Sequence, residues 1–271
     1  MTIKIYNENR LTGQPFFKDL IEYLAEHDEV MLRQIHKDFA DVKNMDRQID
    51  SFIAAGLILR SDKRYSLGFH IFKDSDFDWK RIEDKKAEPQ RNIYEHPIFI
   101  EENSRIEKLL QESNCYPRLT NQTNQVILNF VTSFSYKEYP ENTKVTPTLA
   151  NYFNKVASNL PLTTFEKEIY QMIGDVDPEY ALKYMTTFLL KFMRKDIVKN
   201  KSDIFVNVLE KYNYIEKISE KEYKCLLEFS EQVIPEQKYD DAKSFIIAQI
   251  QQTTAIEPFI SLGDKEAIRI N

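Results

Sequence analysis

Four polar side chains follow one predicted helix at a spacing suited to reading the edges of DNA bases. Asn44, Arg47, Gln48 and Ser51 recur at i, i+3, i+4 and i+7, so a helix places them on one face. The apolar residues of the same segment fall on the opposite face. Arg pairs with guanine and Asn or Gln with adenine when such a helix lies in the major groove. The pattern therefore predicts a face that reads base pairs.

Positively charged residues surround this face and suit contacts with the phosphate backbone. The complete predicted DNA-binding set is Lys43, Asn44, Arg47, Gln48, Ser51, Lys63 and Arg64. Two observations oppose this interpretation. Asp46 and Asp50 lie beside the same face and would repel phosphates, and any solvent-exposed helix face is polar. A DNA-reading face and an ordinary solvated surface both remain open at this point.

Motifs of known catalytic chemistry are absent from the sequence. His27, His36, His70 and His96 lie in unrelated segments, without metal-ligand spacing. There is no P-loop, GxGxxG, nucleophile elbow or HExxH pattern. The two cysteines, at positions 115 and 225, are expected to be ordinary reduced thiols rather than a disulfide or metal ligands. We therefore expect a protein that is not an enzyme, with no cofactor and no metal.

The elements that must position the DNA-reading face follow from apolar periodicity. Residues 2–7 predict a short strand, and helices are predicted at 15–27, 29–39 and 44–55. Gly56 stands where a helix needs a residue in the left-handed conformation. The following "LILRSDKRYSL" predicts two strands around a turn. This order resembles a winged helix, over roughly residues 3–72, and the resemblance implies a helix-turn-helix class of DNA-binding fold.

The rest of the chain predicts a linker and a helical domain. Residues 74–97 are highly charged and contain Trp79, and from 98 onward most apolar residues recur at helical spacing. Only 5 glycines argue against a doubly wound sheet or a β-sandwich. The predicted fold class is mainly α, with domains at 1–73, 98–230 and a C-terminal helix and tail at 231–271. Residues 74–97 are the predicted linker between them.

A second copy of the helix and hairpin is predicted near the end of the helical domain. A shift of 157 residues places Ile49 on Val206, and Gly56 on Asn213, which also tolerates the left-handed conformation. The expected unit spans about 178–227. Chance, or the residue pattern that any helix followed by a hairpin shares, explains the match about as well as duplication does. Its outward residues are less suited to a polyanion, so packing or self-association, including a homodimer, is the expected role.

Two segments carry a resemblance over the whole chain. "IKIYNENRLTGQPFF" and "GDVDPEYALKYMTTFLLKFMRKD" resemble an uncharacterised protein family of low-GC Gram-positive bacteria. The resemblance implies no activity and transfers no functional residue.

Composition limits the remaining functional classes to which the protein could belong. The net charge of −6 disfavours a protein that coats nucleic acid, and the longest nearly apolar run, 52–59, is too short to span a bilayer. The start of the chain has no signal-like apolar core. We therefore expect a cytoplasmic DNA-binding regulator of transcription or replication that does not enter the membrane. The rival hypothesis is an adaptor whose winged helices bind only other proteins.

Overall fold

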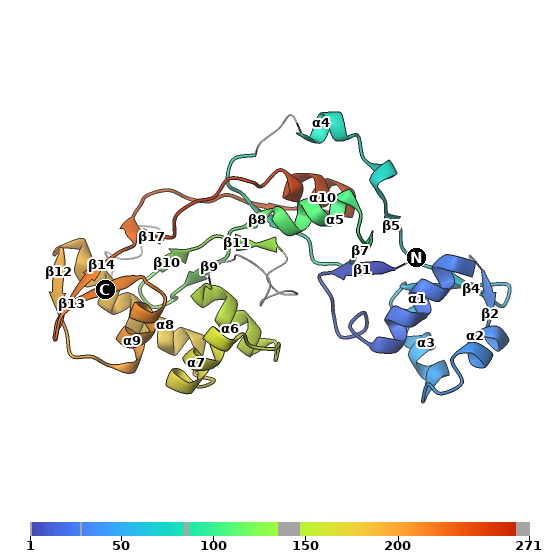
Figure 1. Cartoon of the computed structure of the whole chain (residues 1–271), viewed down its shortest axis with the longest axis horizontal. Helices are drawn as coiled ribbons and strands as arrows, with labels where there is room; N and C mark the ends of the chain where they lie inside the picture. Colours follow the sequence, from blue (N-terminus) through green and yellow to red (C-terminus); the bar gives the residue numbers. More distant parts are fainter. Residues whose placement is uncertain (1, 28, 84–86, 135–146, 264–271) are drawn as a thin grey trace. The chain divides into compact units, whose positions relative to one another are not determined.

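The computed structural model describes residues 2–27, 29–83, 87–134, 147–263 of the chain (Figure 1). It is a mixed α/β protein, 40% helical and 23% strand, and the described residues form six small sheets. The expectation of a mainly α fold is therefore wrong. The segment around 126–134 shows the physical reason. It was expected to be helical, yet it forms β10 (Val126–Asn129) and β11 (Thr132–Ser133), because β-branched and alternating buried residues there suit pairing with distant strands.

The chain folds into two compact units, and each is discontinuous in sequence. Unit 1 contains residues 1–85, 93–111 and 238–250. Unit 2 contains residues 86–92, 112–237 and 251–271. The sequence had suggested consecutive domains instead. β6 (Arg91–Ile93) and β16 (Glu236–Lys238) pair with each other where the chain passes between the units.

Unit 1 begins with the elements that the sequence predicted, and with one strand, β2, at the start of the segment expected to be the second helix. They are β1 (Ile3–Tyr6), α1 (Pro15–His27), β2 (Val30–Met31), α2 (Leu32–Asp38), α3 (Met45–Ala54), β3 (Ile58–Ser61) and β4 (Arg64–Leu67). The three helices pack through Phe17, Ile35 and Phe52, all fully buried, against the antiparallel sheet β2-β4-β3. The Tyr23 hydroxyl donates a 2.6 Å hydrogen bond to Asp38, which joins α1 to α2. This bond raises the pKa of Tyr23.

The charged segment after the hairpin docks onto unit 1. Its elements are β5 (Ile71–Phe72), a 3-10 turn (Asp74–Asp76) and α4 (Trp79–Glu83). The Asp74 carboxylate accepts hydrogen bonds from the backbone of Arg105 and Ile106, at the start of α5 (Arg105–Glu112). The indole of Trp79 donates to the Asp74 carbonyl, and the Arg105 guanidinium lies 4.7 Å from the Trp79 ring centre. Trp79 therefore anchors the segment.

The C-terminal helix α10 (Ala242–Ile250) belongs to unit 1, together with the sheet β1-β7-β5, in which β7 is Ile98–Glu101. Phe245 is buried and stacks on Tyr94 at 5.5 Å. The Tyr239 amide donates to the Ile93 carbonyl. Burial raises the pKa of Tyr94, and the nearby Asp241 carboxylate adds to the effect. The predicted C-terminal helix is therefore present, and it belongs to the first unit.

Unit 2 combines helices with short strands. Its helices are α6 (Leu149–Ala157), α7 (Thr164–Ile173), α8 (Pro178–Leu189) with a 3-10 extension (Leu190–Met193), and α9 (Ile204–Lys211). One sheet has the order β15-β17-β10-β9, with β15 Glu228–Phe229, β17 Phe259–Leu262 and β9 Arg118–Thr120. Another has the order β12-β14-β13, with β12 Ile197–Lys199, β13 Ile215–Ser219 and β14 Glu222–Cys225. β8 (Asn114–Cys115) pairs with β11.

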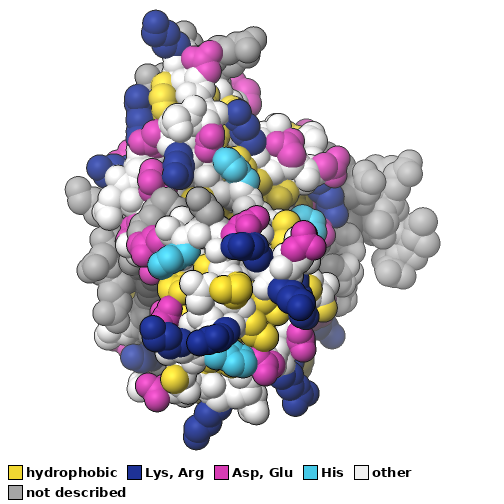
Figure 2. Space-filling view, turned by 90° about the vertical axis from the view of Figure 1, so that its right-hand side faces the viewer, with side chains coloured by type: hydrophobic (Ala, Val, Ile, Leu, Met, Phe, Trp, Pro, Cys, Tyr) yellow, Lys and Arg dark blue, Asp and Glu magenta, His cyan; other side chains and the backbone are white. Residues whose placement is uncertain are grey.

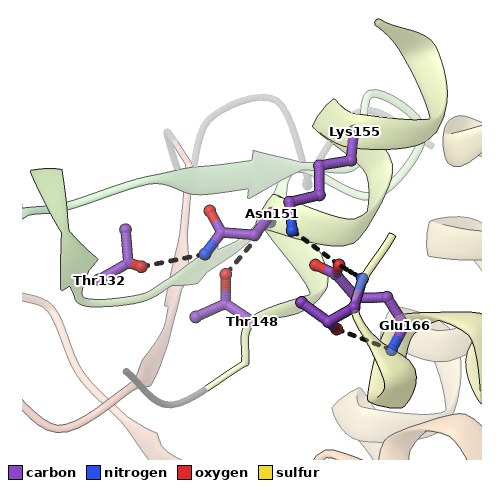
Figure 3. A network of polar contacts seen from close by, with 6 residues as sticks. Thr132, Thr148, Asn151, Lys155 and Glu166 are labelled. Carbon is purple, nitrogen blue, oxygen red and sulfur yellow. Dashed lines mark hydrogen bonds and ion pairs between the residues drawn. The ribbon is translucent and has the colours of Figure 1, made fainter. Parts of the chain in front are cut away.

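A polar network joins α6 to α7 inside unit 2 (Figure 3). The Lys155 ammonium lies 2.8 Å from a carboxylate oxygen of Glu166, and both side chains are almost completely buried. The same carboxylate accepts the Thr163 backbone N–H, while the Thr163 hydroxyl accepts the Glu166 N–H. A capping box is therefore present at the start of α7, and its glutamate also holds a buried lysine.

The same helix–hairpin motif occurs in both units, at residues 45–67 and 204–225. Gly56 and Asn213 have φ of 70° and 58° and end the two helices. The next amide donates back five residues in each case, from Leu57 to Phe52 and from Tyr214 to Leu209, at 2.9 Å both times. The prediction that Asn213 replaces glycine in the left-handed conformation is confirmed.

The two hairpins differ by one residue, because β13 contains an extra residue relative to β3. Asp62 and Lys63 both have positive φ, as a two-residue type I′ turn requires. In the second hairpin the register shifts between Lys217 and Ser219, and this irregularity accommodates the extra residue. The central strands nevertheless align, because Tyr65 and Tyr223 are both buried and pair with a valine of the third strand.

The left-handed residue gives a first prediction. An added Cβ at Gly56 would meet no atom within 4 Å. The free-energy cost of a substitution therefore comes only from holding a non-glycine residue in the left-handed conformation. Gly56→Ala should lower the free energy of unfolding by about 1–2 kcal/mol, and Gly56→Asn by clearly less. Urea unfolding of the full chain measures both. Equal losses for the two variants would contradict this explanation.

The position of α10 gives a second prediction. Phe245→Ala should cost about 3–5 kcal/mol, because it empties a buried aromatic site in unit 1. Trp79 is the single tryptophan and lies in unit 1, so its fluorescence reports the unfolding of that unit. Ser244→Ala is the control, because it changes an exposed residue of the same helix and should cost only about 1 kcal/mol for the lost hydrogen bond to Asp241. An unchanged tryptophan transition for Phe245→Ala would show that α10 contributes nothing to unit 1.

The buried ion pair gives a third prediction. Lys155→Met leaves a buried carboxylate without its cation and should cost about 3–5 kcal/mol. Adding Glu166→Gln removes the charge, retains the cap and should restore most of the loss. Lys211→Met breaks an exposed pair with Glu168, also on α7, and should cost less than about 1 kcal/mol. Thermal unfolding followed by circular dichroism compares them, and a double variant as unstable as the single one would refute the assignment.

Candidate nucleic-acid interface

The start of α3 presents its positively charged residues to solvent. Lys43, Asn44 and Arg47 are exposed, and Gln48 and Ser51 are half-buried. The Gln48 amide donates to the Lys43 carbonyl at 2.8 Å, and the Ser51 hydroxyl donates to the Arg47 carbonyl at 2.9 Å. Gln48 and Ser51 are therefore already engaged by backbone carbonyls, of the residue before the N-cap and of α3 itself. Lys43 and Arg47 make no ion pair within the part of the chain that the structure describes.

The backbone before α3 adopts an unusual conformation. Asn44 has a φ of 55°, and its side chain does not cap the helix. Asparagine is one of the few residues that adopts this conformation at low cost, because its short polar side chain can hydrogen-bond locally. The side chain remains exposed beside Arg47.

The hairpin places two more cations in solvent. Lys63 occupies the second position of the turn with a φ of 64°, and it has no acidic partner among the described residues. The Arg64 Nε atom lies 3.7 Å from a Glu29 carboxylate oxygen, with both side chains more than half exposed. An exposed ion pair of this kind contributes little to the stability of the fold, so Arg64 can readily leave Glu29 for another anion.

One of the two acidic residues beside the helix has a partner that the sequence did not reveal. The His36 Nε2 atom lies 2.6 Å from the Asp46 carboxylate, so a protonated His36 offsets that negative charge. His36, Asn44, Asp46 and Arg47 also line a shallow polar cavity of about 540 Å³. His36 and Asp46 lie on different helices, and only the turn between α2 and α3 brings them together. Asp50 remains exposed.

The surface over α1–α3 is mixed in charge. Figure 2 looks onto this end of the chain and shows Lys and Arg side chains separated by Asp, Glu and His, with hydrophobic atoms between them. Among the hydrophobic side chains of unit 1, Met31 and Leu59 are about half exposed. The face does not form one continuous positive stripe.

The equivalent helix of unit 2 is partly covered. Lys211 of α9 pairs with Glu168 of α7 at 2.6 Å, and the Phe165 and Tyr212 rings meet edge to face. Asn207 and Glu210 are only half-buried, and Asn207 accepts a hydrogen bond from Ser202. α9 thus lacks the open cationic face of α3. That unit 2 packs or self-associates stays a prediction.

In the residues that the structure describes, no group of three or more His, Cys, Asp or Glu side chains could hold a metal ion. Cys115 and Cys225 form no disulfide, and burial raises the pKa of Cys225. None of the described helices is long and apolar enough to cross a bilayer.

Comparison with known proteins identifies one region. A family model described as "Domain of unknown function (DUF1803)" matches residues 3–113. A DUF1803 domain covers this part of the chain. It includes α1–α3, the first hairpin and α5, but not α10 of the same unit. No curated protein and no solved structure matches the chain.

Proposed function

We propose that the DUF1803 region binds double-stranded DNA as a winged helix, in a cytoplasmic regulator of transcription or replication. α3 would enter the major groove and the β3–β4 hairpin would contact the backbone. One observation carries the proposal. α3 leads through Gly56 directly into the hairpin, and both carry exposed cations that make at most weak, exposed ion pairs.

The contacts of α3 narrow the residues that would read bases. Arg47 and Asn44 are exposed, whereas Gln48 and Ser51 would first have to give up hydrogen bonds to backbone carbonyls. Arg47 suits a guanine and Asn44 an adenine. Lys43, Lys63 and Arg64 suit phosphates. Recognition would therefore depend on few bases, and much of the affinity would come from the backbone.

The charge around the face limits the affinity. Asp50 is exposed beside α3, and the chain as a whole carries −6. Binding through about three phosphate contacts predicts a slope of roughly −3 for log K against log salt. An adaptor that binds only proteins, the rival function, predicts no DNA binding at any salt concentration.

Fluorescence anisotropy with a labelled mixed-sequence duplex tests the proposal. Arg47→Glu and Lys63→Glu should each weaken binding by roughly fivefold or more. Lys221→Glu is the matched control, because Lys221 occupies the corresponding turn position in the hairpin of unit 2. Its affinity should equal that of the unaltered chain.

Three outcomes would reject the proposal. They are no binding at low salt, binding that does not depend on salt, and an effect of Lys221→Glu as large as that of Lys63→Glu. Unfolding midpoints of the variants show whether a loss of binding reflects a loss of structure.

A further inference from the structure

Unit 2 contains two adjoining cavities that share part of their walls. The first has a volume of about 1070 Å³ and lies between β12, the end of α8 and the loop 123–125. The second has a volume of about 600 Å³ and is bounded by β10, β15 and β17. Met193 and Leu262 line both cavities. We refer to the pair as the unit 2 groove.

The first cavity is positively charged on a chain that is negative overall. Its charged lining residues are Lys191, Arg194, Lys195 and Lys199, and no Asp or Glu lines it. Lys199 lies 3.3 Å from Glu222, and Lys191 stands over the Phe188 ring. Arg194 and Lys195 have no acidic partner within the described residues. Four like charges around one cavity repel one another, so an anion bound there would stabilise them.

The second cavity is mainly apolar. Its lining includes Ile127, Phe229, Val233, Ile234 and Ile260. Val233 is 78% exposed and the shared Met193 is 49% exposed. Side chains of this type at such exposure next to a concave surface are typical of a binding site rather than of a packed core.

The combination of a cationic end and an apolar end restricts the chemistry of the occupant. A nucleic acid strand would need aromatic side chains for its bases, and no aromatic residue lines the cationic cavity. A free phosphate would make no use of Met193, Leu262 and the apolar cavity beyond them. A molecule with one anionic head and one hydrocarbon tail uses both ends.

We propose that the unit 2 groove binds a free fatty acid. Its carboxylate would lie among Lys191, Arg194 and Lys195, and its chain would pass Met193 and Leu262 into the apolar cavity. Each methylene of the chain that is removed from water there adds to the affinity. The site is separate from the proposed DNA interface, because all of its residues belong to unit 2.

Titration of the full chain with 11-(dansylamino)undecanoic acid tests the site. The expected result is saturable binding to one site with enhanced dansyl fluorescence. Laurate should displace the probe, and methyl laurate, which has the same chain without the charge, should be about tenfold weaker or worse. Equal displacement by the two would show non-specific apolar binding and overturn the proposal.

Variants test the two ends separately. The double change Arg194→Glu and Lys195→Glu, and the single change Val233→Asp, should each lower probe affinity about tenfold. Lys183→Glu is the control, because Lys183 is an exposed cation of α8 that lines neither cavity. Absence of saturable binding, or equal affinity in all variants, would overturn the proposal.

Two further experiments would reveal a different occupant of the unit 2 groove. Binding of the chain to anionic phospholipid vesicles, without binding of monomeric laurate, would assign the groove to a membrane surface. A chain ending at Gly263 that binds the probe about tenfold more tightly than the full chain would assign it to residues 264–271. Either result would replace the fatty acid as the occupant.

Discussion

A single left-handed residue at the end of a helix determines the helix–hairpin motif in both units. At Gly56 and Asn213 the chain reverses direction within two residues, and the next amide closes the helix by bonding back five positions. The following strand then starts with a buried isoleucine, and the returning strand places a buried tyrosine in the sheet. A residue that could not adopt this conformation would misdirect the hairpin and the core side chains that it carries.

The same motif has different surroundings in the two units. α3 packs on one face and leaves the other to solvent, where its cations face outward. α9 has α7 beside it, and the Lys211–Glu168 pair uses a cation that the equivalent helix would otherwise expose. The neighbours of the motif, rather than the motif itself, therefore decide whether it presents a binding face. This is why only unit 1 supports the proposal of DNA binding.

The sequence predicted the elements that depend on local information. Helices α1–α3, the first hairpin and the left-handed conformation of Asn213 follow from periodicity and from residues with special backbone preferences. The mainly α class was wrong because β10 and β17 are short strands that pair with each other although they lie more than a hundred residues apart in the chain. The contact of His36 with Asp46 and the unit 2 groove likewise depend on residues brought together by the fold. The exposed cations of α3 could be named from sequence, but the engagement of Gln48 and Ser51 could not.

The place of α10 has a consequence for how the protein is made. Synthesis runs from the N-terminus, and domains generally fold as they emerge. Here the ring of Tyr94 is covered only after Phe245, some 150 residues later in the chain, has been synthesised. The first unit therefore stays incomplete on the ribosome until nearly the whole polypeptide has been translated, and the second unit is synthesised in between.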